Sequence, residues 1–212
     1  MAAIIADIKP TGMNQRDLVD LVYQLTSSLV GLAAKLDADD AAVTTYTTGI
    51  DAIFNCQVED SKGNVTRLAG TESSTVAPFY SITPNGITNE ALLEWMYQWT
   101  AALYSLCYTL DNSAGVGTTT YIANAYTAIM TDRIVNRRGQ TTGASYTFTF
   151  NAVDHRGGRI VEWLYDAVNA VETLTELLDL DATLTDTNYE ALWFTNNITL
   201  TVENNAGNRV GN

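Results

Sequence analysis

Two acidic segments contain the residues best suited to chemistry in this sequence. Each follows a stretch of helical periodicity and places several carboxylates close together. The residues are Asp37, Asp39 and Asp40 in the first segment and Asp179, Asp181 and Asp186 in the second. Closely spaced oxygen ligands suit calcium, although both segments lack the Asp-x-Asp-x-Asp-Gly spacing and the distal glutamate of a calcium loop. Aspartate also caps the start of a following helix, so capping is the alternative interpretation.

Other reactive side chains are sparse. His155 is the only histidine, and no Gly-x-Ser-x-Gly elbow accompanies it. Cys56 and Cys107 with one histidine cannot complete a zinc site. We expect both to be buried free thiols, with a disulfide between them as the alternative. Neither a phosphate-binding loop nor a dinucleotide fingerprint is present. The sequence therefore predicts no catalytic residue, no metal and no cofactor, with an enzyme that uses an acidic site as an alternative.

Composition limits the partners of the chain. Of its 212 residues 46% are apolar and 17% are charged, and the net charge is −13. A field of this sign repels phosphate backbones and anionic membrane surfaces, so we expect neither nucleic acid nor a membrane as a partner. The start, MAAIIADIKP, lacks the basic and apolar regions of a signal peptide. No segment approaches the ~20 apolar residues of a transmembrane helix.

Internal similarity divides the sequence into three units. The segments IKPTGM and LVDLVYQ, from Ile8 and Leu18, align with ITPNGI and LLEWMYQ, from Ile82 and Leu92. A third copy is visible where IVEWLY, from Ile160, aligns with LLEWMY. We expect the units to span residues 1–72, 73–143 and 144–212. A unit of this size buries little surface alone, so the three are expected to share one core.

Each unit contains the apolar stripe of a long amphipathic helix. Apolar residues recur at three- and four-residue steps over residues 18–36, 92–110 and 160–178. A shorter helix is predicted after each stripe, with its apolar positions within residues 43–53, 122–129 and 189–193. Threonine is frequent in these shorter segments and weakens helix propensity, so they should depend on neighbours for stability.

A recurring turn predicts a hairpin at the end of each unit. The segments DSKG, NRRG and NNAG, from Asp60, Asn136 and Asn204, share Asp or Asn first and Gly fourth. This is the chemistry of a type I turn followed by a positive φ. Alternating residues over 145–150 and 198–202 predict strands. The predicted fold class is α+β, with three tandem repeats of strand, long helix, short helix and β-hairpin. The sequence leaves open whether the units form a ring or a line.

Two sets of charged residues stand at positions where parts of an assembly could meet. Three acids occupy equivalent places in the long helices and would approach one another if the units closed around an axis. They are Asp20, Glu94 and Glu162. The one local basic cluster consists of Arg133, Arg137 and Arg138, which are interface candidates for an acidic neighbour. A solvated hairpin tip is the alternative for these arginines.

The surface composition is the basis of a family resemblance. Lysine occurs three times, and threonine-rich runs such as TTYTT at 44–48 and TTT at 118–120 replace charge. In these features and in its tandem modules, the chain resembles virion structural proteins of tailed bacteriophages. The resemblance implies a non-enzymatic capsid-associated, neck or tail component, located in the virion and assembled in the host cytoplasm. It also implies that the partners are copies of the chain itself or other structural proteins.

A second class of function remains open. The chain has 11 tyrosines and 4 tryptophans, and aromatic rings serve as stacking platforms in ligand- or glycan-binding modules. Most of these aromatics fall on the apolar stripes, where a place in the core is expected. Tyr104 and Tyr108 are the candidates for exposed rings.

Overall fold

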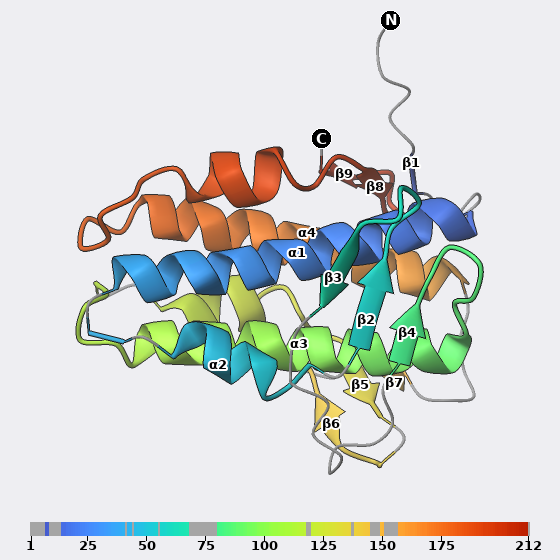
Figure 1. Cartoon of the computed structure of the whole chain (residues 1–212), viewed down its shortest axis with the longest axis horizontal. Coiled ribbons are helices and arrows are strands. Elements are labelled where there is room, and N and C mark those ends of the chain that lie inside the picture. Colours follow the sequence, from blue (N-terminus) through green and yellow to red (C-terminus); the bar gives the residue numbers. More distant parts are fainter. Residues whose placement is uncertain are drawn as a thin grey trace, which may run out of the picture.

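Three long helices form the centre of the molecule. The computed structural model describes residues 7–8, 14–40, 42–43, 45–54, 56–67, 80–117, 120–136, 138–144, 149–150 and 157–211. The long helices are α1 (Gln15–Asp39), α3 (Asn89–Asp111) and α4 (Gly157–Asp179). They lie side by side, and in Figure 1 each begins at the right and ends at the left. Their C-terminal ends, and the loops that follow them, therefore gather at one end of the molecule, called here the loop end.

Local sequence explains where the first two long helices begin. The side-chain oxygen of Asn14 accepts a hydrogen bond from the backbone N–H of Asp17 at 2.9 Å, and that of Thr88 accepts from Ala91 at 3.1 Å. Both contacts satisfy a backbone donor that has no partner within the helix. The predicted apolar stripes are confirmed as the buried faces of the three helices. Burial of these faces against each other is the main stabilising contribution.

A cluster of tryptophans fills the centre of the bundle. The rings of Trp95 and Trp99 on α3 each meet Trp163 of α4 edge-on, with centroids 5.5 and 5.7 Å apart, and all three are fully buried. The indole N–H groups of Trp95 and Trp99 donate to the Thr26 hydroxyl and the Leu25 carbonyl on α1. The tryptophans therefore connect all three long helices, as core residues.

Three short helices lie in the grooves between the long ones. They are α2 (Tyr46–Asp51), η1 (Ile122–Thr127) and η2 (Glu190–Thr195). Each contacts two long helices: α2 contacts α1 and α3, η1 contacts α3 and α4, and η2 contacts α4 and α1. The second and third are widened, because the N–H groups of Ala128 and Asn196 bond carbonyls five residues back, on Ala123 and Ala191. The first is shorter than the predicted 43–53.

Three small sheets surround the half of the bundle away from the loop end (Figure 1). Their strand orders are β3-β2-β4, β6-β5-β7 and β9-β8-β1. In each sheet the central strand pairs antiparallel with its hairpin partner and parallel with a third strand. The strands are β1 (Asp7–Ile8), β2 (Cys56–Glu59), β3 (Val65–Arg67), β4 (Tyr80–Ile82), β5 (Arg133–Val135), β6 (Thr141–Thr142), β7 (Thr149–Phe150), β8 (Thr201–Glu203) and β9 (Arg209–Val210).

The third strand of each sheet comes from the segment before a long helix. Strand β4 precedes α3 and pairs with β2, β7 precedes α4 and pairs with β5, and β1 precedes α1 and pairs with β8. At the same register position these strands place Ile82, Phe150 and Ile8, all fully buried. Because β1 joins the last sheet of the chain, the first and last parts of the described structure are hydrogen-bonded together.

The hairpin turns have the predicted chemistry. The side-chain oxygens of Asp60, Asn136 and Asn204 accept backbone N–H groups two and four residues later, at 2.7–3.0 Å. The glycines in fourth place have φ values of 82°, 74° and 82°, a conformation that side chains with a Cβ rarely adopt. These short-range contacts are fully encoded in four or five consecutive residues.

The mixed helix and sheet composition confirms the predicted α+β class. The strand predicted over 198–202 is displaced, because β8 runs from Thr201 to Glu203. The strand predicted over 145–150 is described only at Thr149–Phe150, and residues 145–148 lie outside the described part. Within the described residues, no helix combines the length and the apolar character that crossing a membrane requires.

Candidate functional site

The acidic residues that end the long helices hold the starts of the short ones. Each carboxylate accepts two consecutive backbone N–H groups at the beginning of the next short helix. The contacts are Asp37 to Tyr46 and Thr47, Asp111 to Tyr121 and Ile122, and Asp179 to Tyr189 and Glu190, at 2.6–3.1 Å. A carboxylate is unfavourable at a helix C-terminus and favourable at an N-terminus. The hydrogen bonds to the short helices therefore offset the unfavourable electrostatic energy of a carboxylate at the C-terminal end of a long helix.

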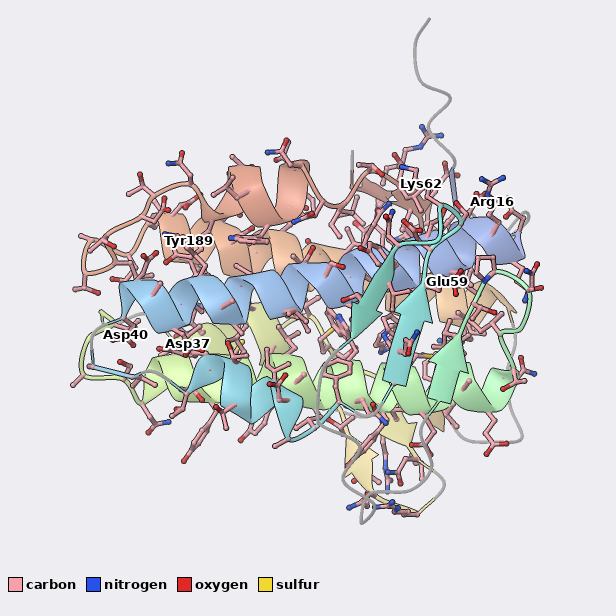
Figure 2. All side chains as sticks on the ribbon, in the orientation of Figure 1. Arg16, Asp37, Asp40, Glu59, Lys62 and Tyr189 are labelled. Atoms are coloured by element: carbon pink, nitrogen blue, oxygen red, sulfur yellow. The ribbon has the colours of Figure 1, made fainter. Side chains whose placement is uncertain are left out.

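The tyrosine at the start of each short helix makes a second link. Its hydroxyl donates to a carboxylate: Tyr46 to Asp40 at 2.6 Å, Tyr121 to Asp181 at 3.0 Å, and Tyr189 to Asp39 at 2.6 Å. All three tyrosines are buried, and burial followed by their aspartate neighbours raises the pKa of each. Figure 2 shows Asp37, Asp40 and Tyr189 at the loop end, opposite Arg16, Glu59 and Lys62.

Asp40 connects the first loop to the second. It is 1% exposed and accepts hydrogen bonds from the Ser113 and Tyr46 hydroxyls and the Ala42 N–H. Burial alone would raise its pKa, but these donors together lower it. Gly115 lies so close that a Cβ there would be 2.2 Å from the Asp40 Oδ1 atom. A glycine at position 115 is therefore needed for the second loop to pass this close to the Asp40 carboxylate.

Asp181 connects the third loop to the second in a similar way. It is 4% exposed and accepts from the backbone N–H groups of Gly117 and Thr183, besides the Tyr121 hydroxyl. Burial opposes ionisation, yet the donors again lower the pKa. Asp40 and Asp181 thus remain charged inside the protein because donors surround them.

Asp39 and Asp186 share a lysine between the first and third loops. The Lys35 ammonium lies 3.0 Å from the Asp39 carboxylate and 2.9 Å from that of Asp186. The Thr185 hydroxyl donates to Asp39 at 3.2 Å, beside the bond from Tyr189. The hydrogen bonds that Lys35 donates to Asp186 and Asp39 raise its pKa. The three loops are therefore joined in a closed set of contacts.

These contacts show how the candidate calcium ligands are used. All six receive hydrogen bonds from protein donors, and Asp37 and Asp179 cap helices, as the alternative interpretation proposed. In the described part of the chain, no group of three or more His, Cys, Asp or Glu side chains is arranged to hold a metal ion. The spacing of the acids is explained by the loops they connect.

Two of the three equivalent acids of the long helices bind hairpin tips. Asp20 accepts the Ser61 N–H and hydroxyl, both at 2.6 Å, and Glu162 accepts the Asn205 N–H at 2.5 Å. Glu94, at the equivalent place in α3, is 7% exposed. For Asp20 and Glu162, the carboxylate of each helix anchors the tip of a hairpin, and this role accounts for the recurrence of an acid at this position.

Two arginines of the basic cluster, Arg133 and Arg138, have different surroundings. Arg133 lies within β5 and is half-buried, whereas Arg138 is exposed at the hairpin turn, where its N–H donates to the Asn136 side chain at 3.0 Å. Arg137 lies outside the described residues, as does His155. Arg138 is thus the member of the cluster that the structure places on the surface, and an interface role for it stays a prediction.

Both cysteines are confirmed as buried free thiols. Burial, followed by the charge of Glu94, raises the pKa of Cys56 to about 12, and its thiol donates to Gln98 at 3.4 Å. Burial also raises the pKa of Cys107. A thiol held protonated in this way is a poor nucleophile.

Tyrosines line a shallow groove on the outer face of α3. Tyr104 and Tyr108 are 42% and 51% exposed, with ring centroids 6.1 Å apart, and Tyr126 of η1 lies 5.1 Å from Tyr104. Two adjoining hollows of about 350 and 390 Å³ share Tyr104 and two threonines. Their lining contains no charged residue and consists of Ile53, Tyr97, Ala101, Tyr104, Ser105, Tyr108, Tyr126, Thr127, Thr141, Thr142, Gly143 and Ala144. The prediction that Tyr104 and Tyr108 are exposed is confirmed.

The sequence does not reveal the hydrogen-bonding role of the tyrosines at the loop end. Tyr46 and Tyr189 fall within the predicted apolar segments 43–53 and 189–193, whereas Tyr121 precedes the segment 122–129. The available signal was a tyrosine nine or ten residues after Asp37, Asp111 and Asp179. Its partner carboxylate could not be found, because Asp181 is 60 residues from Tyr121 and Asp39 is 150 from Tyr189.

Comparison with known proteins places no constraint on the function. No protein-family model, no curated protein and no solved structure matches this chain.

Proposed function

We propose that the chain consists of three copies of one unit closed into a ring with pseudo-threefold symmetry. Three kinds of contact support this arrangement, and each occurs once per proposed unit: an aspartate cap, a side-chain-capped hairpin turn, and a parallel strand completing the sheet of another unit. The contacts of the short helices also follow a cycle through α1, α3 and α4. Such closure lets three small units share one core.

We further propose that the protein is a non-enzymatic structural protein that binds neighbouring molecules in a larger assembly, with a virion as the setting that the resemblance suggests. The observation that carries this proposal is the use of the acidic residues. Asp40 and Asp181 are buried and surrounded by protein donors, and Asp37 and Asp179 cap helices. The acidic side chains that could have done chemistry are thus used to hold the loops and short helices of the proposed ring in place.

The outer surface offers suitable contact groups. A net charge of −13 opposes close approach of two copies, so contacts are favoured where the surface is uncharged. Large apolar side chains are exposed at several separate elements, and three sheets present edge strands whose backbone groups can pair with another chain. The exposed side chains are Val65, Tyr104, Tyr108, Leu180 and Leu192.

Native mass spectrometry over a range of protein concentrations, with and without EDTA, tests the proposal. We expect discrete oligomers, with three- or sixfold stoichiometry the most informative, that survive EDTA. A protein that stays monomeric at every concentration and binds no companion protein would contradict the assembly function. Oligomers that EDTA dissolves would instead show that the acidic loops bind calcium.

A second candidate function rests on the tyrosine groove. Neutral hydroxyl groups from tyrosines and threonines border exposed ring faces of Tyr104 and Tyr108. Ring faces can stack on the apolar side of a sugar, while hydroxyls bond its oxygens. The chemistry fits an uncharged oligosaccharide better than an anionic one, because the chain is strongly acidic.

A glycan array with neutral and acidic oligosaccharides tests this candidate. We expect binding of neutral members that is lost in Tyr104→Ala and Tyr108→Ala. Leu192→Ala, an exposed apolar side chain on η2, serves as the control and should leave binding unchanged. Absence of binding by the unmodified protein across the array would argue against a glycan site.

A further inference from the structure

Each sheet is completed by a strand that precedes a long helix, and the pairing of that strand with the sheet is called here a joint. In two of the three joints, one segment of the chain connects the sheet to this strand, and in the third no such segment does. The segment from β3 leads directly to β4, which completes the same sheet, and the segment from β6 leads directly to β7. Strand β1 and its partner β8 instead lie at opposite ends of the described sequence, at Asp7–Ile8 and Thr201–Glu203. The β1–β8 joint is therefore held by non-covalent contacts alone.

This joint has the same geometry as the other two. Asp7 pairs with Thr201 as Ser81 pairs with Gln57, and Ile8 pairs with Val202 as Ile82 pairs with Val58. Ile8 and Val202 are both 0% exposed. If β1 leaves, the edge of β8 and an apolar space shaped for one isoleucine become available. The partner that fits both is another β1.

We propose that β1 of one molecule pairs with β8 of a second copy of this chain, and that this strand exchange links copies in the assembly. The proposal rests on the proposed assembly function for its biological role. Exchange uses contacts that the closed molecule already makes, so it needs no new surface. Reciprocal exchange between two copies gives a closed dimer, whereas exchange in one direction gives an open chain of molecules.

Concentration decides between the closed and exchanged forms. Within one molecule β1 is present at an effective concentration on the order of millimolar, so a dilute solution favours the closed ring. In a crowded lattice, neighbouring copies reach similar local concentrations, and exchange becomes competitive. Strands β4 and β7 cannot exchange as easily, because the chain holds each beside its own sheet.

Mixing two variants that each carry one added cysteine, besides the buried Cys56 and Cys107, tests the exchange. Asp7→Cys and Thr201→Cys are mixed at high concentration and oxidised, so that a disulfide between them forms only when β1 of one molecule lies beside β8 of another. Asp7→Cys mixed with Gln57→Cys is the matched control, because Gln57 occupies the place of Thr201 in the sheet that β4 completes. We expect about tenfold more heterodimer in the test mixture than in the control.

A second measurement uses the unmodified protein. Unlabelled and 15N-labelled protein are mixed, incubated at high concentration, and examined by native mass spectrometry. Mixed-label oligomers together with the heterodimer support strand exchange. Oligomers without the heterodimer above control overturn strand exchange and leave the assembly function in place. Monomers in every sample, again without heterodimer and without binding of a companion protein, overturn both proposals.

Discussion

Asp40 keeps a negative charge inside the protein because three donors replace the water it has lost. Its bonds come from two different loops, so the carboxylate fixes the position of one loop against another. Asp181 does the same between the second and third loops. A carboxylate that accepts several hydrogen bonds is far more favourable folded than unfolded, provided that it is ionised. The charge of each group is thus part of the fold.

Replacement of Asp40 should therefore lower stability in a pH-dependent way. Asn at this position offers one acceptor oxygen and turns an amide N–H₂ toward the donors, so we expect Asp40→Asn to lose about 2–3 kcal/mol at pH 7. The folded pKa is below the unfolded value of 3.8. The stabilisation is present above pH 3.8 and is lost as pH falls through the folded pKa.

Urea denaturation at pH 7 and at pH 3 measures this effect. The difference between Asp40→Asn and the unmodified protein should shrink at the lower pH. Asp186→Asn, which removes a partly exposed partner of Lys35, is the control and should cost less. Equal losses for the two variants at pH 7 would show that Asp40 has no special role.

Asp166 on α4 should have the opposite effect on stability. Burial first, and then the charges of Asp132 and Glu162, raise its pKa to about 7. In the unfolded chain the carboxyl ionises near pH 3.8, so between these values stability falls as pH rises. We expect Asp166→Asn to raise the free energy of unfolding by roughly 1–3 kcal/mol at pH 8 and to change it very little at pH 4.

Thermal unfolding from pH 4 to pH 8 checks the prediction for Asp166. The exposed Glu176→Gln on the same helix controls for the loss of one negative charge. A variant at position 166 with the same pH slope as the unmodified protein would contradict the assignment. The two aspartate predictions use separate pH ranges, so one does not obscure the other.

The packing of the short helices depends on small residues in the long ones. A Cβ on Gly31 of α1 would lie 2.0 Å from the Cζ3 atom of Trp193 on η2. Glycine costs about 1 kcal/mol in a helix interior relative to alanine, so its presence here is explained by the approach of the tryptophan. The third short helix can therefore lie directly on the first long one.

We expect Gly31→Ala to lower stability by about 1–3 kcal/mol despite its better helix propensity. In a Trp193→Ala background the same change should become neutral or stabilising, because the ring that it meets is absent. A double-mutant cycle by chemical denaturation measures this coupling. Gly157→Ala, where a Cβ would meet nothing within 4 Å, is the control. Additive effects of Gly31→Ala and Trp193→Ala would disprove the contact.

For the whole molecule, the important feature is that the last sheet is completed by the first strand. If the three joints are equivalent, the position of the chain ends is arbitrary. The same three long helices, tryptophan cluster and sheets would form wherever the proposed ring is opened. This follows from the identical pairing pattern of β1, β4 and β7.

A circular permutant tests this equivalence. We join residue 211 to residue 7 with a linker copied from the segment between β6 and β7, and open the chain between residues 72 and 73. The permutant should fold to the same helix content, with a free energy of unfolding within about 1–2 kcal/mol of the parent, because the same contacts form. Circular dichroism and urea denaturation measure both quantities. An unfolded permutant would mean that the joints differ.

Several features could be predicted from the sequence alone because they depend on neighbours in the chain. The buried faces of α1, α3 and α4 follow from residues three and four positions apart. The turns at Asp60 and Asn204 are encoded within five residues. The free thiols could also be anticipated, because the two cysteines stand at unrelated points of the sequence. The exposure of Tyr104 and Tyr108 follows from their place beside the apolar stripe.

Tertiary structure alone decided the rest. Asp39 and Tyr189 are 150 residues apart, and their hydrogen bond exists because the loops after α1 and α4 meet at one end of the bundle. The pairing of β1 with β8 likewise joins segments that lie far apart in the described sequence. Neither contact leaves a local pattern, because a carboxylate or a two-residue strand can be satisfied by many partners. The packing of the long helices determines which of these partners lies within reach.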